Sequence, residues 1–399
     1  MIERELYMNK IRPFIGKDII KVITGIRRSG KSVMMGLIMK ELEKQGVSTS
    51  NIINLNFEDM SNAPLQNPEN LYDYIKERAE KNSGKTYIFL DEIQEVTNWE
   101  KAVNSVRATL LADIYLTGSN SRLLSGELAT YLAGRYAQFT IYPFSYKEFL
   151  LSKNAADSPS MFGEYLLLGG MPFLASLSYK PEESAKYQRD LYASVLLRDI
   201  VQRNRLRDTE LLERIIRYTL SNIGQMFSAS SISKYLKSEG RKVANDTVLS
   251  YLNACCDAYL FYRFPRLDLI GKKILTVNEK YYVADHGLRE AVYGNNIKDI
   301  GEVLENIVAL ELLRRGYKAT VGKAKEQEID FVAEKNNNLI YIQVTYLLAD
   351  KSTVEREFKV YDKICDNFPK YVLSLDEFDF GQNGIRHENI RNFLLSDDW

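Results

Sequence analysis

A short stretch near the amino terminus has the residue types of a phosphate-binding loop. Gly25 to Ser32 reads GIRRSGKS and fits the pattern G-x-x-x-x-G-K-S/T, after an apolar segment that predicts a strand and before one that predicts a helix. Glycines let backbone N–H groups approach phosphate oxygens, and the helix start adds the positive end of its dipole. We expect Lys31 to reach the β- and γ-phosphates and the Ser32 hydroxyl to bind Mg²⁺. The residues expected to contact the nucleotide are Gly25, Ile26, Arg27, Arg28, Ser29, Gly30, Lys31, Ser32 and Val33.

Two adjacent carboxylates supply the second half of such a site. The segment YIFLDE, from Tyr87 to Glu92, predicts a buried strand that ends in Asp91 and Glu92. Asp91 is placed to hold Mg²⁺ directly or through water, and Glu92 is placed to orient and polarise the attacking water. An acidic pair at the end of a buried strand would be costly without a metal and a triphosphate. The sequence therefore predicts an ATPase, and ATP is favoured over GTP because no guanine-reading motif is evident.

Further polar residues are candidates for contacts to the reacting phosphate. Ser119 and Asn120 end the segment DIYLTGSN, and one of them is expected to act as a sensor; turn formation is the alternative role. The transition state also needs positive charge, often an arginine from a neighbouring subunit. Arg135 in LAGRY is the preferred candidate, and Arg122 and Arg198 are the others. For each arginine, a structural ion pair is the alternative.

The elements that must position these residues alternate regularly over residues 17–145. The expected strands are DIIKVITG, NIINLNFED, TYIFLDEI and DIYLTGSN. The expected helices are KSVMMGLIMKELEKQG, LYDYIKERAEK and NWEKAVNSVRATLL. This alternation predicts a mostly parallel sheet that is covered by helices on both faces.

Chemistry of a second kind is suggested near the carboxyl end. IDFVAEKNNNLIYIQVTY, from 329 to 346, predicts a hairpin around an Asn-rich turn and carries Asp330 and Gln343. A preceding helix contributes Glu305. Nucleases of one large class combine such acids with a lysine, but Thr345 stands at the lysine position, and Lys323 or Lys325 are the nearest replacements. The three residues therefore predict a vestigial nuclease-like site that retains nucleic-acid or protein binding, with metal-dependent cleavage or an ordinary packed sheet as alternatives.

The middle of the chain has helix–turn–helix spacing followed by a strand pair, which predicts a winged helix. The exposed face of its second helix is polar but not basic, and a packing or protein-binding role is the alternative to DNA contact. The residues expected on that face are Asn245, Asp246, Thr247, Ser250 and Asn253. The flanking residues available for phosphate contacts are Lys237, Arg241, Lys242, Lys272 and Lys273.

Taken together, these motifs resemble the bacterial and archaeal AAA+-type ATPases that carry a carboxyl-terminal domain of unassigned function. The matching stretches are GIRRSGKS, NFED, YIFLDEIQ, LTGSNS, LAGR, YPFSYKEF, LGGMP and LLRDI. The resemblance implies an α/β fold class: a P-loop NTPase (AAA+/ASCE) parallel-sheet domain, a helical lid, a winged helix and a restriction-endonuclease-like PD-(D/E)xK domain. The expected boundaries are 1–145, 146–207, 208–295 and 296–399, respectively.

Composition narrows the environment and the partners. Lys+Arg and Asp+Glu are both 53, so overall charge indicates neither nucleic acid nor membrane. No apolar run approaches the roughly 20 residues of a membrane span, and three cysteines do not form a disulfide framework, so we expect a cytoplasmic protein. Two histidines exclude three-His metal sites and Cys/His zinc fingers.

Three functions follow as hypotheses. The first is an ATP- and Mg²⁺-dependent hydrolase that acts on DNA, as a homo-oligomer if the arginine is supplied in trans. The second is a nucleotide-gated signalling or scaffold protein with a protein partner. The third is an ATP-dependent nuclease.

Overall fold

The computed structural model describes residues 2–121, 134–269, 271, 273–324 and 327–399. Arg122, Lys272 and Lys325 lie outside the described residues. The chain divides into two compact units. The first consists of Met1–Ile141 and Asp257–Tyr259, and the second of Tyr142–Cys256 and Leu260–Trp399.

The first unit has a five-stranded sheet with the order β2-β3-β4-β1-β5, in which every neighbouring pair is parallel. Its strands are β1 Ile20–Thr24, β2 Ile52–Asn56, β3 Thr86–Asp91, β4 Ala112–Gly118 and β5 Tyr136–Thr140. The predicted parallel sheet is confirmed. β5 was not predicted, because YAQFT is a short edge strand that mixes polar and apolar residues without a clear buried face.

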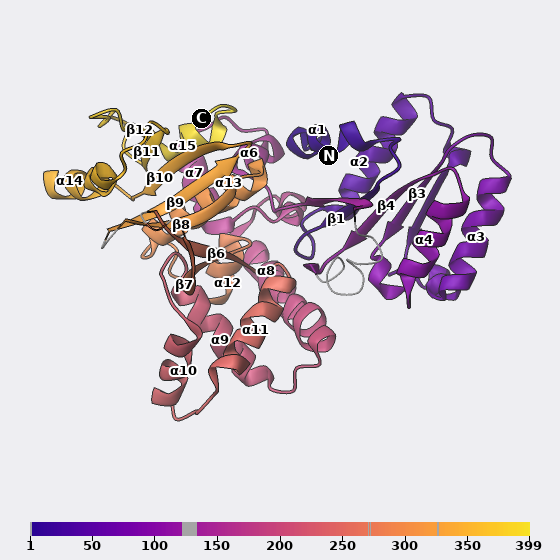
Figure 1. Ribbon diagram of the computed structural model, residues 1–399, viewed down its shortest axis with the longest axis horizontal. Coiled ribbons are helices and arrows are strands. Elements are labelled where there is room, and N and C mark those ends of the chain that lie inside the picture. The colour runs from indigo at the N-terminus through magenta and orange to yellow at the C-terminus, as the bar shows by residue number, and fades with distance from the viewer. Residues whose placement is uncertain (1, 122–133, 270, 272, 325–326) are drawn as a thin grey trace. The chain divides into compact units, whose positions relative to one another are not determined.

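Helices cover both faces of this sheet (Figure 1). They are α1 Glu5–Ile11, α2 Lys31–Lys44, α3 Pro68–Glu80 and α4 Trp99–Thr109. Because side chains alternate along a strand, Ile88 and Leu90 of β3 face one way and join the core formed with α3 and α4. Phe89 between them faces the other way and stacks on Tyr115 of β4 at 4.5 Å between ring centroids. Parallel pairing brings the carboxyl ends of β1, β3 and β4 to one edge, where the candidate residues lie.

The second unit has a seven-stranded mixed sheet with the order β12-β11-β10-β9-β8-β6-β7. Its strands are β6 Phe261–Asp268, β7 Lys273–Val283, β8 Lys318–Ala324, β9 Gln327–Lys335, β10 Asn338–Val344, β11 Lys370–Ser374 and β12 Arg386–Asn389. The predicted hairpin is confirmed: β9 and β10 pair antiparallel, and Asn336 and Asn337 between them have φ of 52° and 64°. Positive φ at both turn residues suits the twist of a hairpin.

Ten helices accompany this sheet in the described part of the second unit. They are α6 Tyr146–Lys153, α7 Pro159–Leu168, α8 Pro181–Ser194, α9 Thr209–Ser221, α10 Ala229–Ser238, α11 Asn245–Asp257, α12 His286–Val292, α13 Ile300–Arg315, α14 Lys351–Lys359 and α15 Ile390–Leu395. A π-helical segment, Val195–Gln202, continues α8. β6 pairs antiparallel with β7 and parallel with β8. The segments expected as a winged helix and as a nuclease-like domain therefore share one sheet.

The Gly169-Gly170 break, expected between helices, is a point of close backbone packing. The Gly170 N–H donates to Asp285 Oδ2 at 2.7 Å, and the Phe144 N–H donates to the Gly170 carbonyl at 2.6 Å. A Cβ at position 170 would lie 2.2 Å from the Phe144 carbonyl oxygen. Only glycine fits at position 170, so the LGGMP motif has a structural reason.

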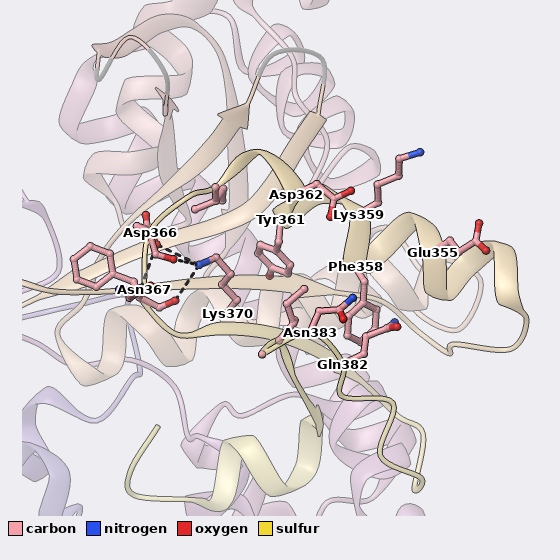
Figure 2. Close-up of a pocket in the computed structure, with 14 residues that line it drawn as sticks. Glu355, Phe358, Lys359, Tyr361, Asp362, Asp366, Asn367, Lys370, Gln382 and Asn383 are labelled. Carbon is pink, nitrogen blue, oxygen red and sulfur yellow. Dashed lines mark hydrogen bonds and ion pairs between the residues drawn. The ribbon is translucent and has the colours of Figure 1, made fainter.

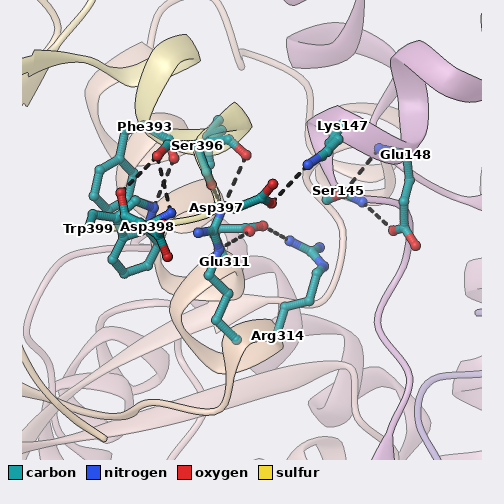
Figure 3. A network of polar contacts seen from close by, with 12 residues as sticks. Ser145, Lys147, Glu148, Glu311, Arg314, Phe393, Ser396, Asp397, Asp398 and Trp399 are labelled. Carbon is teal, nitrogen blue, oxygen red and sulfur yellow. Dashed lines mark hydrogen bonds and ion pairs between the residues drawn. The ribbon is translucent and has the colours of Figure 1, made fainter. Parts of the chain in front are cut away.

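The carboxyl terminus is held against the second unit by polar and aromatic contacts (Figure 3). Lys147 Nζ lies 2.8 Å from Asp397 Oδ1, and Trp399 Nε1 donates to the Phe393 carbonyl at 3.0 Å. The rings of Trp399 and Phe393 stack with centroids 4.1 Å apart. The last residues are therefore part of the fold of this unit.

Candidate functional site

The phosphate loop lies between β1 and α2, as the sequence predicts. Gly25 has φ of 138°, and a Cβ there would lie 2.2 Å from the Ile141 carbonyl oxygen. Gly30 caps α2 with φ of 101°. Both positions use conformations that disfavour other residues, so the two glycines of the motif are required by the backbone path. The chain enters α2 with the loop N–H groups at the helix start, where anions bind.

Lys31 is buried at the centre of this loop. Its Nζ lies 3.3 Å from the carbonyl oxygens of Gly25 and Ile26, and 3.8 Å from Glu92 Oε1. A side chain held in this way is oriented before a nucleotide arrives. Lys31 therefore lies within contact distance of both the phosphate loop and Glu92, which follows β3.

Asp91 ends β3 in a buried position that other polar groups support. Thr117, on the neighbouring strand β4, donates its hydroxyl hydrogen to Asp91 Oδ1. Burial raises the pKa of the Asp91 carboxyl, while hydrogen bonds from Thr117 and Ser32 act to lower it. Ser32 and Asp91 therefore touch each other, and their oxygens are of the type that Mg²⁺ prefers. This donor set fits Mg²⁺.

Glu92 follows Asp91 with a left-handed backbone, at φ of 55° and ψ of 48°. Its N–H donates to Thr117 Oγ1 at 2.8 Å. Its carboxylate accepts the Ser119 hydroxyl at 3.0 Å and 3.3 Å and the side-chain amide of Gln94. The carboxylate is thus held by two neutral donors beside Lys31, which is the arrangement of a positioned base.

Two of these contacts were not anticipated from the sequence. Thr117 holds both acidic residues, and the sequence signal for it is a polar residue near the end of a mostly apolar strand. Gln94 belongs to the YIFLDEIQ stretch, and its Oε1 is buried without a hydrogen-bond partner among the residues that the structure describes. Of the two sensor candidates, Ser119 contacts Glu92. Asn120, the next residue in the chain, is buried.

The remaining loop residues differ in exposure. Ile26 and Ser29 are buried, whereas Arg28, Ser32 and Val33 are exposed. Arg27 Nη2 lies 2.6 Å from Glu58 Oε1, which belongs to the NFED stretch after β2. Arg4, which no sequence motif indicated, donates from Nη1 to the Ser29 carbonyl at 2.9 Å and is itself buried. The amino-terminal segment therefore braces the loop.

Arg135 lies away from the phosphate loop of its own chain. Its carbonyl accepts the N–H of Ile20, the first residue of β1, and β5 runs parallel to β1. The loop follows the last residue of β1, so the Arg135 backbone lies at the opposite end of the strand. Its side chain is exposed. Arg198 is also exposed, in the π-helical segment of the second unit.

The structure also brings together Glu305, Asp330 and Gln343 in the second unit. The Asp330 N–H donates to Gln343 Oε1 at 3.2 Å, and Asp330 Oδ2 accepts the Val344 N–H at 2.9 Å. Lys280 of β7, which was not predicted, contacts Glu305 at 2.8 Å and Asp330 at 3.1 Å. The cation of this cluster therefore comes from neither Lys323 nor position 345.

The predicted helix–turn–helix surface is exposed as expected at Asn245, Asp246, Ser250 and Asn253 of α11, and Thr247 is half-buried. Among the flanking cations, Lys237, Lys242 and Lys273 are exposed, whereas Arg241 pairs with Asp208. Two apolar side chains of the same helix pair are also exposed, Leu249 and Tyr235.

A cavity of about 720 Å³ opens in the second unit between α14 and β11 (Figure 2). Glu355, Asp362 and Lys359 line one part of it, and Lys370 pairs with Asp366 in another. No residue predicted from the sequence lines this cavity. The predicted sites therefore do not coincide with it.

Comparison with known proteins agrees with the architecture. Residues 17–150 match the model of an AAA domain, and residues 160–299 and 300–391 match domains of unknown function, DUF8612 and DUF4143. Across the part of the chain that the structure describes, no helix has the length and apolar character needed to cross a membrane.

Among solved structures, the Aeropyrum pernix Orc1 protein in complex with DNA is 12% identical, with a TM-score of 0.31, and the match covers 73% of this chain and 92% of that one. The replication initiator DnaA bound to AMPPCP and single-stranded DNA is 16% identical, with a TM-score of 0.34, and the match covers 63% and 86%. The parallel sheet and the phosphate loop described above are those of a P-loop NTPase.

Two whole-chain relatives establish the family. An uncharacterized protein of Haemophilus influenzae is 39% identical over 379 residues, covering 94% of this chain and 93% of that protein. The uncharacterized protein MJ1544 of Methanocaldococcus jannaschii is 32% identical over 387 residues, covering 92% and 83%. The chain therefore belongs to one family with these bacterial and archaeal proteins. In this chain, an AAA domain of the P-loop ATPase type precedes the domain of unknown function DUF4143.

Proposed function

We propose that this protein binds ATP with Mg²⁺ and hydrolyses it at the edge of the first sheet. The observation that carries the proposal is the position of Glu92, which is held by Ser119 at 3.0 Å and lies 3.8 Å from Lys31. One carboxylate is thereby fixed beside the cation that would meet the terminal phosphates. A merely structural ion pair would not need the left-handed backbone of Glu92 or the two positive-φ glycines of the loop.

Each residue has a role that its geometry supports. The loop N–H groups and Lys31 bind the phosphates, and Ser32 and Asp91 hold Mg²⁺. When bound, Mg²⁺ would neutralise charge that develops on the phosphate oxygens. Glu92 accepts a hydrogen bond from the attacking water and so orients it toward the phosphorus. Ser119 and Gln94 donate hydrogen bonds to the Glu92 carboxylate and keep it in place.

The test is nucleotide binding and steady-state turnover of the full chain. Lys31→Ala is expected to lose nucleotide binding, because the cation at the phosphates is removed. Glu92→Gln is expected to keep binding and to lose turnover by about 10²-fold, or about 2.7 kcal/mol of barrier. Lys44→Ala, on the exposed last turn of the same helix, is the matched control and should behave like wild type. Wild-type affinity and turnover in Lys31→Ala would disprove the site.

We further propose that hydrolysis serves an action on DNA, with α11 as the contact surface. The exposed polar residues of α11 and the exposed Lys237 and Lys242 support this role. ATP turnover should then rise with added DNA, and the stimulation should fade as salt increases, because phosphate contacts release counterions. Lys237→Ala/Lys242→Ala should weaken the stimulation without changing basal turnover.

A protein partner is the second candidate for the same surface. Leu249 and Tyr235 expose 40% and 43% of their area on α11 and α10, and Asp246 would repel phosphate. Turnover that is indifferent to DNA at low salt would favour this nucleotide-gated signalling role. In either case, Arg135 of one subunit would act at the nucleotide site of a neighbouring copy. Turnover would then rise more steeply than in proportion to protein concentration, and Arg135→Ala would remove that effect.

A further inference from the structure

A lysine lies at the centre of the acidic cluster in the second unit. Lys280 Nζ is 2.7 Å from Glu328 Oε1, 2.8 Å from Glu305 Oε1 and 3.1 Å from Asp330 Oδ1. Its side chain is only 3% exposed. The three carboxylates come from α13 and β9, whereas the lysine comes from β7. One ammonium group therefore holds three acids from two other elements.

The carboxylates have further donors around this ammonium. The Tyr282 hydroxyl donates to Glu305 Oε1, and the Val344 N–H donates to Asp330 Oδ2 at 2.9 Å. The backbone of Gly224 also approaches Glu305, since a Cβ there would lie 3.1 Å from Oε2. Glu305 Oε1 and both carboxylate oxygens of Asp330 are thus already engaged by protein donors.

The electrostatics of the cluster depend on the lysine. Burial alone would lower the pKa of Lys280, but Glu305, Asp330 and Glu328 raise it well above its ordinary value. Burial and the neighbouring Asp330 raise the pKa of Glu305. Lys280 therefore stays charged in the fold, and removing it would leave like charges buried together, which is costly.

We infer that Lys280 takes the place of a divalent cation in this cluster, so that Glu305, Glu328 and Asp330 form a closed ion cluster and not the metal centre of a nuclease. A metal ion bound by these acids would need their oxygens at about 2.0–2.6 Å, in the space that the ammonium fills. Among the described residues, no group of three or more His, Cys, Asp or Glu side chains has an arrangement suited to a metal ion. The residues present do not fit the metal that the nuclease resemblance implies.

The cluster also joins two parts of the chain that family models separate. Lys280 lies within the 160–299 match, and its three partners lie within the 300–391 match. These contacts add to the shared sheet, in which β6 pairs with both β7 and β8. The acidic residues consequently serve to fasten β7 to α13 and β9, and the two matched segments form one cooperative unit.

Thermal unfolding of the full chain in a Trp99→Phe background tests the inference, because Trp399 then reports the second unit alone. Lys280→Met should lower that transition by about 10 °C, since breaking a buried charge cluster is strongly destabilising. Asp330→Asn, added to Lys280→Met, should recover part of the loss by removing one uncompensated charge. Lys273→Met, an exposed lysine on the same strand, is the matched control and should leave the transition unchanged. An unchanged transition in Lys280→Met would overturn the inference.

A second measurement keeps Lys280 in place, in the same Trp99→Phe background, and does not require Lys280→Met to fold. Mn²⁺ is titrated by calorimetry, without nucleotide, into this chain and into its Asp330→Asn variant. The two titrations should show the same binding, and Mn²⁺ should not raise the temperature of the unfolding transition that Trp399 reports. Binding or plasmid cleavage that depends on Mn²⁺ and is lost in Asp330→Asn would show a working metal centre and would refute the closed cluster. These results are independent of ATP turnover in the first unit.

Discussion

Thr117→Val replaces a buried hydroxyl by a methyl group of nearly the same size and removes two hydrogen bonds at once. The hydroxyl donates to the Asp91 carboxylate and accepts the Glu92 N–H at 2.8 Å. A hydrogen bond to a charged group contributes about 1.5–3 kcal/mol, and a buried N–H left without a partner costs about 1–3 kcal/mol. The two terms overlap, because one side chain serves both, so we expect a loss of about 3 kcal/mol in the free energy of unfolding of the first unit.

The assay needs a signal from the first unit alone. The chain has two tryptophans; Trp99 is in the core of the first unit and Trp399 stacks in the second. In a Trp399→Phe background, denaturant unfolding followed by tryptophan fluorescence therefore reports the first unit. Thr117→Ser keeps the hydroxyl and is the control, with a smaller loss from the missing methyl group.

The same substitution should lower ATP turnover, because Thr117 positions the end of β3 that carries Asp91 and Glu92. We expect a fall of at least tenfold in kcat, with Thr117→Ser close to wild type. A Thr117→Val chain that unfolds within about 0.5 kcal/mol of wild type and turns over ATP normally would refute the argument. The acidic pair would then be positioned by its own strand and not by β4.

Other predictions concern single side chains. Ser119→Ala should lower kcat about tenfold, the equivalent of one hydrogen bond to a charged group, with KM nearly unchanged in a steady-state assay; a normal kcat would remove Ser119 from the site. Gly170→Ala should destabilise the second unit by about 2–4 kcal/mol in denaturant unfolding, because its Cβ would lie 2.2 Å from a carbonyl oxygen, whereas Gly163→Ala, with open space around its Cβ, should not. Burial lowers the pKa of His286 to about 4. As the pH falls, His286 is protonated near pH 6.5 in the unfolded chain but only near pH 4 in the folded chain. The free energy of unfolding of the wild type therefore falls over that pH window. His286→Gln should gain up to about 3 kcal/mol relative to wild type between pH 6.5 and 4, and a constant difference would contradict this.

The sequence alone determined the parts of this protein that depend on neighbouring residues. GIRRSGKS between a strand and a helix and YIFLDE at the end of a buried strand predict a loop and an acidic pair, because their spacing is set by the chain itself. The βα alternation and the Asn-rich hairpin are local in the same sense, and the observed parallel sheet and the β9–β10 pair confirm them. β5 was not predicted, because this short edge strand has neither an apolar run nor a clear alternation of apolar and polar residues.

The tertiary structure decided which distant residues meet. Leu90 pairs with Leu116, so the register of β3 against β4 places Thr117 beside Asp91, and no spacing in the sequence states that register. Likewise Lys280 contacts Asp330, which lies 50 positions later in the chain. The local sequence pattern had predicted a lysine close in sequence to the acids. Arg135 was brought to the far end of β1 by the parallel pairing of β5. Local patterns specify elements and their end residues, whereas strand order and register specify the partners of those residues.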